Sequence, residues 1–173
     1  MLQKQEIDLF SDVANPLDFV EEVMSLHDWT FERVDEGEIS VQVSGEFSHY
    51  TMSFVWQDDV NALDFKCSVD IDVIAEKRLQ ALEAINEVNS KLWLGHFDLP
   101  KGQTQPRFRH TSLLRGMTEG SGIDLIEDLI QIALAECERY VIAFDLLSKT
   151  EEQSAAINTD KMNLALMDVS GIS

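Results

Sequence analysis

The sequence predicts an α+β domain with a largely antiparallel sheet and helices packed on one face, in the order α-β-β-β-β-α-β-β-α. Between residues 29 and 73, apolar and polar residues alternate with period two, as in strands with one buried and one solvated face. On either side of this stretch, apolar residues recur at helical spacing. The links between consecutive strands are short, which favours an antiparallel meander.

The first helix is expected to run from Asn15 to about His27. Asn15 is a favoured N-cap residue, and Pro16 suits the first helical position, where its missing N–H is harmless. Leu17 and Val20 begin an apolar stripe with helical spacing.

Four strands should follow this helix. The first is expected near residues 30–34. Three clearer alternating runs lie at 39–43, 50–56 and 63–73. Turn-like stretches separate the four strands, at 35–37, 45–46 and 57–61.

The second half of the chain predicts two helices with two short strands between them. The first of these helices should span Ala75 to Leu92 and bury Leu79, Leu82, Ile85 and Leu92. The strands are expected near 94–99 and 107–114. In the last helix, Ser121 and Asp124 resemble a capping box, and a wide apolar face follows as far as Leu147.

These elements define one domain over residues 15–148, with an N-terminal arm over 1–14 and a flexible C-terminal tail over 149–173. A length of 173 residues fits one domain better than two. Both tails carry apolar patches, at Leu9-Phe10 and at Met162–Val169. One hypothesis is that these patches occupy a binding surface in the free protein.

Composition narrows the class of partner. Thirty-two acidic residues face thirteen basic ones, giving a net charge of −19. This charge repels nucleic acid and anionic membranes, so protein partners with neutral, basic or apolar surfaces are expected. The chain has neither a signal peptide pattern nor a long apolar run, which predicts a cytoplasmic protein. Cys67 and Cys137 lie in apolar patterns and are expected to be buried, reduced thiols.

Motifs of catalysis are missing from the sequence. Glycine-rich phosphate loops, a nucleophile elbow and paired zinc-ligand motifs are all absent. We therefore expect no enzymatic activity and no cofactor.

The candidate binding residues fall in the second half of the chain. One face of a predicted strand carries Arg107, Arg109 and Arg115. These arginines either form ion pairs with acidic residues of a neighbouring strand, or line a slot that binds an anionic group or an acidic peptide. The ion-pair interpretation is the simpler. His96 and His110 become neighbours if their strands pair. The two histidines could then contribute to a ligand site. Alternatively, they form hydrogen bonds with backbone groups or acidic side chains beside the sheet.

Three further residues have a structural interpretation. Asn86 and Asn89 lie one turn apart beside an apolar stripe, and an amide near a core needs hydrogen-bond partners. We expect them to fix the segment at 93–97 that follows. Trp93, like Trp29 and Trp56, is expected in the core or at its edge.

Several strings together resemble the YbjN family. They are Asn15-Pro16-Leu17 with Trp29 downstream, the run from Ile85 to Phe97 that contains WLGHF, Arg109-His110 with LLRG after it, and ALAECER from Ala133 to Arg139. The resemblance spans about residues 15–144. It implies a bacterial, cytosolic sensory transduction regulator with a fold like that of type III secretion chaperones, often dimeric, with no established cofactor or catalytic residues.

The sequence and the resemblance together favour a non-enzymatic protein-binding module, chaperone-like or regulatory, that forms a homodimer. The alternative is a small-molecule or metal-responsive sensor that uses His96, His110 and the strand arginines. The candidate binding or fold-determining residues are therefore Asn86, Asn89, Trp93, His96, Arg107, Arg109, His110 and Arg115.

Overall fold

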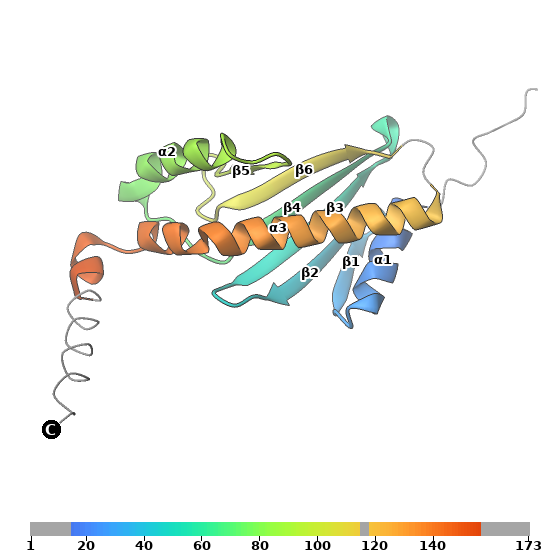
Figure 1. Ribbon diagram of the computed structural model, residues 1–173, viewed down its shortest axis with the longest axis horizontal. Helices are drawn as coiled ribbons and strands as arrows, with labels where there is room; N and C mark the ends of the chain where they lie inside the picture. The colour runs from blue at the N-terminus through green and yellow to red at the C-terminus, as the bar shows by residue number, and fades with distance from the viewer. Residues whose placement is uncertain (1–14, 115–117, 157–173) are drawn as a thin grey trace, which may run out of the picture.

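The structure, a computed structural model, describes residues 15–114 and 118–156 (Figure 1). The α-helices are α1 (Pro16–Leu26), α2 (Arg78–Asn89) and α3 (Glu119–Leu147). The strands are β1 (Phe31–Asp35), β2 (Glu38–Ser44), β3 (His49–Gln57), β4 (Ala62–Val69), β5 (His96–Asp98) and β6 (Arg107–Leu113). Two 3-10 turns, η1 (Asp58–Val60) and η2 (Ala75–Lys77), join them. The predicted order of helices and strands is confirmed.

The strands form one sheet in the order β1-β2-β3-β4-β6-β5. Every neighbouring pair is antiparallel. The register aligns apolar side chains across the sheet: Met52 pairs with Cys67, Cys67 pairs with Phe108, and Phe108 pairs with Phe97. Because paired residues point to the same side, these side chains form one continuous apolar face.

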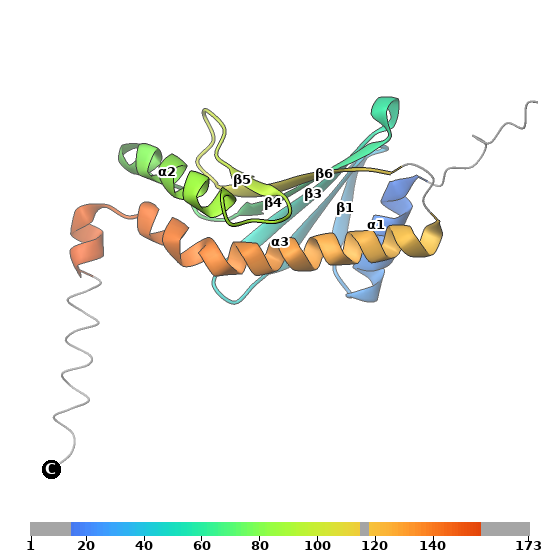
Figure 2. The same cartoon turned by 45° about the horizontal axis from the view of Figure 1, so that its top comes forward.

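The helices cover that apolar face. Figure 1 shows α3 running across the strands with α1 beside it, and the turned view in Figure 2 shows the sheet behind both helices. Helix α2 lies next to β5 and contributes buried residues to the same core. The α+β class with an antiparallel sheet and helices on one face is confirmed; the likeness to type III secretion chaperones stays a prediction.

Helix α1 begins as the sequence predicts. The Asn15 side chain accepts a hydrogen bond from the Leu17 N–H, and Pro16 occupies the first turn. Helix α3 differs, because its capping box pairs Thr118 with Ser121 instead of Ser121 with Asp124. Ser121 is thus the third helical residue, and the helix starts earlier than predicted.

The prediction for α2 was wrong in its bounds and in part of its face. The helix spans only Arg78–Asn89, and its buried residues are Ala81, Ile85 and Val88. Leu79 is 70% exposed and Leu82 is 40% exposed. The sequence contained two stripes at helical spacing, and packing against β5 and α3 selected the one with the smaller side chains.

The remaining expectations concern the cysteines and the chain ends. Cys67 and Cys137 are buried and unpaired, with 3.8 Å between their Sγ atoms, so their predicted burial is confirmed. The proposed arm at 1–14 and most of the tail, from residue 157, lie outside the described residues. Within the described part, no helix has both the length and the apolar run required to cross a membrane.

Candidate functional site

Asn89 fixes the start of β5. Its side-chain Nδ2 donates to the carbonyl oxygen of Phe97 at 2.9 Å, and its Oδ1 accepts from the Phe97 N–H at 2.7 Å. Phe97 is 1% exposed and contacts the rings of Phe108, Tyr140 and Phe144. The last residue of α2 therefore clamps an edge strand to the core, as the structural interpretation of Asn89 expected.

Gly95 sets the path of the chain into β5. Its φ is +66°, in the left-handed region that glycine adopts without a steric cost. A Cβ here would lie 2.2 Å from the Phe108 ring and 2.8 Å from the Arg109 carbonyl oxygen. A glycine is required at this close approach, and it allows the chain to turn directly after Trp93 and Leu94.

Trp93 is exposed, not buried as the sequence analysis expected. Its relative exposure is 77%, whereas Trp29 and Trp56 pack against the core. The Asn89 clamp and the Gly95 turn place Trp93 ahead of the edge strand, where neither α2 nor α3 covers it. A large apolar side chain held in solvent on a fixed backbone is a candidate binding residue.

Trp93 lines a groove between the start of β5, the covered side of β6 and α3. We call it the Trp93 groove; its volume is about 400 Å³. It is lined by Trp93, Leu94, His110, Ser112, Ser121, Asp124, Leu125, Asp128, Leu129 and Ile132. Asp124 and Asp128 are exposed on neighbouring turns of α3. The groove thus combines apolar walls with an acidic rim.

His110 supplies a polar group in this groove. Burial lowers its pKa below the ordinary value, and the nearby charge of His96 lowers it further. Its imidazole is therefore held neutral at pH 7, when it can donate one hydrogen bond and accept another.

The groove contains the residue types of a hydrolytic triad, but not the geometry. His110, Ser112 and two aspartates line it. A triad needs hydrogen bonds from nucleophile to base and from base to a third group. No such bond joins these side chains in the described residues.

The opposite face of β4, β6 and β5 carries a network of ion pairs. Arg107 Nε donates to Asp98 Oδ1 at 2.6 Å, and its second nitrogen donates to Asp98 Oδ2 at 3.2 Å. Arg109 lies 3.4 Å from Asp98 and 3.3 Å from Asp64. Lys66 adds a contact of 3.0 Å to Asp64. The arginine contacts are the cross-strand pairs of the simpler interpretation, although the buried Nε of Arg109 has no hydrogen-bond partner within the described residues.

Asp64 is the centre of this network and is only 4% exposed. Burial acts to raise its pKa, but hydrogen bonds from Lys66 and Thr111 and the charges of Lys66 and Arg109 outweigh burial. The pKa therefore lies below its ordinary value, and Asp64 stays ionised at neutral pH. A buried carboxylate with this many donors is a structural anchor of the sheet.

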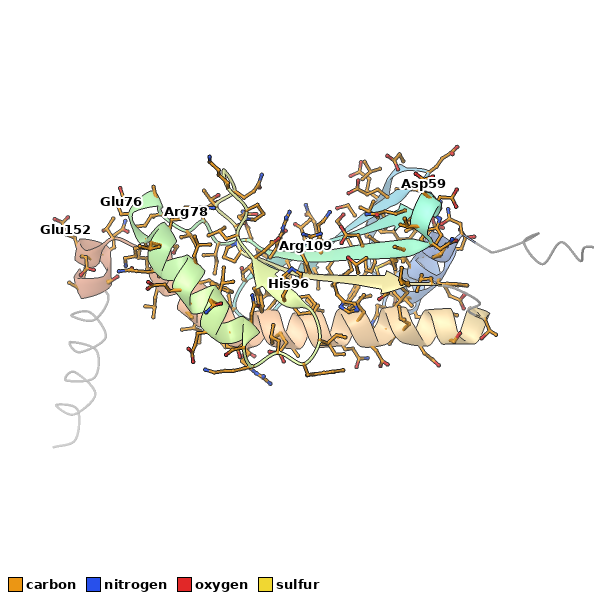
Figure 3. The ribbon with its side chains drawn as sticks, turned by 90° about the horizontal axis from the view of Figure 1, so that it is seen from above. Asp59, Glu76, Arg78, His96, Arg109 and Glu152 are labelled. Carbon is orange, nitrogen blue, oxygen red and sulfur yellow. The ribbon has the colours of Figure 1, made fainter. Side chains whose placement is uncertain are left out.

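The two histidines lie on opposite faces of the sheet, although β5 and β6 do pair. His96 is in register with Arg109, whereas His110 lies on the side that faces α3. Figure 3 shows His96 next to Arg109 on the strand pair. The described residues contain no cluster of three or more histidine, cysteine, aspartate or glutamate side chains suited to a metal.

Two other sequence candidates do not join the groove. Asn86 is exposed, and its side chain makes no hydrogen bond within the described residues, so it does not help Asn89 to hold the segment at 93–97. Arg115 lies outside the described residues. Of the predicted set, the structure brings Trp93 and His110 together in the groove, and Arg107, Arg109 and His96 together on the other face.

Sequence reasoning missed the α3 side of the groove and both acidic partners of the arginines. Leu125 and Ile132 were not among the residues assigned to the apolar face of the last helix, although their spacing of one heptad was visible. Asp64 was assigned only to the polar face of its strand, and Asp98 could not be distinguished among thirty-two acidic residues. Only the β4–β6–β5 order identifies them as partners.

The geometry defines a small acidic α+β domain with a preformed groove. A family model described as "Putative bacterial sensory transduction regulator" matches residues 16–146. The chain therefore belongs to the YbjN family. A crystal structure of YbjN from E. coli, described as "a putative transcription regulator", matches with a TM-score of 0.48 and 11% identity, over 72% of this chain and 92% of that chain. No curated protein matches the chain.

Proposed function

We propose that this protein is a non-enzymatic protein-binding module with a regulatory or chaperone-like role, and that its partner docks in the Trp93 groove. The observation that carries the proposal is the 77% exposure of Trp93 on a backbone fixed by Asn89 and Gly95. Tryptophan is enriched among the residues that dominate binding energy at interfaces. Family membership, with its description as a regulator, agrees with this role.

Charge complementarity defines the partner segment. The rim of the groove carries Asp124 and Asp128, and the chain has a net charge of −19. A segment with an apolar side chain for the groove and a lysine or arginine beside it satisfies both the walls and the rim. The same charge argues against nucleic acid and anionic membranes as partners and is consistent with the expected cytoplasmic location.

The experiment compares three proteins as bait in a bacterial lysate: the wild type, Trp93→Ala and Leu79→Ala. Leu79 is a matched control, because it is also an exposed apolar residue at 70% but lies outside the groove. A partner retained by the wild type and Leu79→Ala should be lost by Trp93→Ala. With that partner purified, Trp93→Ala should weaken binding at least about 30-fold, the size expected of a dominant interface residue.

Charge and assembly are tested on the same purified proteins. Asp124→Asn with Asp128→Asn should weaken binding less at high salt than at low salt, because salt screens exposed charges. Sedimentation of the free protein tests the expected homodimer. Equal affinity of wild type and Trp93→Ala for every retained partner would refute the groove as the docking site.

The second candidate function is a small-molecule sensor. The groove's volume of about 400 Å³ lies within the usual range for such ligands. Apolar amines would suit its walls and rim, and should raise the melting temperature of the wild type but not of Trp93→Ala. Divalent metal ions test the metal-responsive version, with His110→Ala and His96→Ala as separate variants because the two side chains lie on opposite faces.

A further inference from the structure

A second groove lies at the other end of α3. It has a volume of about 670 Å³ and is formed by the β2–β3 turn and the last turns of α3. We call it the Phe47 groove, after the exposed aromatic residue of that turn. Phe47 is 56% exposed and Ile142 is 57% exposed; both line the groove. Leu146, one turn beyond Ile142, is 56% exposed. Three large apolar side chains therefore face solvent in one small region.

The frame of this groove is fixed. The Glu46 N–H donates to Glu138 Oε1 on α3 at 2.8 Å. Gly45 packs so closely against Glu138 and Tyr50 that a Cβ would lie 1.8 Å from Glu138 Oε1. The turn is thus fastened to α3 and holds Phe47 outward. Such a preformed surface loses little entropy when a ligand binds.

The end of α3 is fixed as well. The Ile74 N–H donates to the Leu147 carbonyl oxygen at 3.2 Å, and Lys77 Nζ donates to the Leu146 carbonyl oxygen at 3.1 Å. The chain beyond Leu147 therefore starts next to the groove. The described residues end at Ala156, and seventeen residues follow in the sequence.

These following residues match the groove in chemistry and reach. They contain an apolar patch at Met162, Leu164, Leu166 and Val169, with Lys161 just before it. Residues 151–156 are helical, which places Ala156 at most about 22 Å from Leu147. The eight residues from Ala156 to Leu164 span up to roughly 28 Å when extended, and Ile142 lies about 8 Å back along the axis of α3 from Leu147. The patch is therefore within reach of the groove from its own α3.

We propose that the Met162–Val169 segment of the same chain docks in the Phe47 groove, with its leucines against Phe47 and Ile142. A tethered segment acts at an effective concentration in the millimolar range, so modest apolar contact suffices. The groove is lined by Glu46, Asp70 and Asp145, and the segment carries Lys161 with Asp160 and Asp168, so the docking rests on apolar contact and tethering and not on charge. A second copy would instead bring another net charge of −19 toward this acidic rim.

Disulfide trapping tests this docking in the full-length protein. Phe47→Cys is combined with Leu164→Cys under mild oxidation. Cys67 and Cys137 are both 0% exposed, so they do not compete with the surface thiols. The control combines Leu79→Cys with Leu164→Cys, because Leu79 is 70% exposed and follows Lys77, which contacts the end of α3, but lies outside the groove.

The expected result is an intramolecular disulfide between positions 47 and 164 that forms at least about tenfold faster than the control disulfide, as a docked segment requires. Equal rates for the two pairs would overturn the proposal. Disulfide-linked dimers in place of the intramolecular product would also overturn it, and would assign the groove to a second copy.

Hydrogen exchange gives an independent check without new cysteines. Leu164→Asp with Leu166→Asp should place charges against the apolar groove and release the segment. Amide exchange at residues 45–48 should then become faster, while exchange in β4 stays unchanged. Asn158→Asp adds charge outside the apolar patch and should leave all rates as in the wild type. Unchanged exchange at 45–48 in the double variant would contradict the docking.

Discussion

The two faces of the β5–β6 pair differ in whether their side chains have partners. On the open side, Arg107 and Arg109 are matched by Asp98 and Asp64 through short contacts. On the side that faces α3, Trp93 is left in solvent beside a groove. A cationic strand face is unusual in so acidic a sequence, but its arginines are already paired with aspartates of the same sheet. The apolar residue without a partner is the better sign of an interaction site.

The largest expected effect concerns the glycine on which both sides depend. Gly95→Ala combines a left-handed backbone with a Cβ 2.2 Å from Phe108, and should lower the free energy of unfolding by about 3 kcal/mol or more. Gly102→Ala is the control, because Gly102 also has positive φ, +82°, but has open space around it. Denaturant unfolding should give about 1 kcal/mol for the control. Equal losses would contradict the steric argument.

On the open side, Asp64→Ala should lower the free energy of unfolding by about 2–3 kcal/mol, because Arg109 and Lys66 lose a buried partner. Asp58→Ala, in an exposed turn, should change it by less than about 0.5 kcal/mol. Partner binding at the Trp93 groove should be unchanged in both folded variants. A selective loss of binding in Asp64→Ala would mean that the two sides are coupled.

The same residue gives a pH dependence. Because the pKa of Asp64 is lower in the folded state than its ordinary value of 3.8, the unfolded chain binds this proton more readily. The stabilisation by Asp64 is therefore complete above the unfolded pKa and is lost as pH falls through the folded pKa. Comparison of Asp64→Asn with the wild type between pH 2 and 6 should show a difference in stability that shrinks as pH falls. A constant difference would contradict this assignment.

Substitutions of Asn89 and Asn86 should differ in their effect on stability, by less than the changes above. Asn89→Ala removes both hydrogen bonds to Phe97 and should cost about 1–2 kcal/mol of stability. Asn86→Ala changes an exposed side chain and should cost less than about 0.5 kcal/mol. Native-state hydrogen exchange should also show earlier opening of β5 in Asn89→Ala alone. Similar costs for the two variants would mean that the clamp does not hold the strand.

The smallest effect on stability is expected at the residue proposed to matter most for binding. Trp93→Ala should change the free energy of unfolding by less than about 0.5 kcal/mol, because the side chain is 77% exposed. Thermal and denaturant unfolding measure this directly. A loss above about 1 kcal/mol would show that Trp93 supports the fold, and its exposure would then no longer indicate a docking site.

The pattern of the sequence was sufficient for the elements that depend on local physics. Period-two alternation located the strands, although the run expected at 63–73 extended past β4, which ends at Val69. Asn15 with Pro16 located the start of α1. These features are short in range, because strand faces and helix caps involve residues within a few positions of each other. The Asn89 contact to Phe97 also spans only eight residues, and it was anticipated in kind.

The burial of a side chain could not be predicted from the local sequence where it depends on residues far away in the chain. Asp64 meets Arg109 across forty-five positions, and Leu79 and Leu82 are exposed because β5 and α3 contact the other side of α2. Trp93 was assigned to the core on residue type, since large aromatic side chains usually gain from burial. The Gly95 turn and the Asn89 clamp hold it outside instead. The order of the strands and the position of α3 settle which side chains find partners, and no local pattern encodes either.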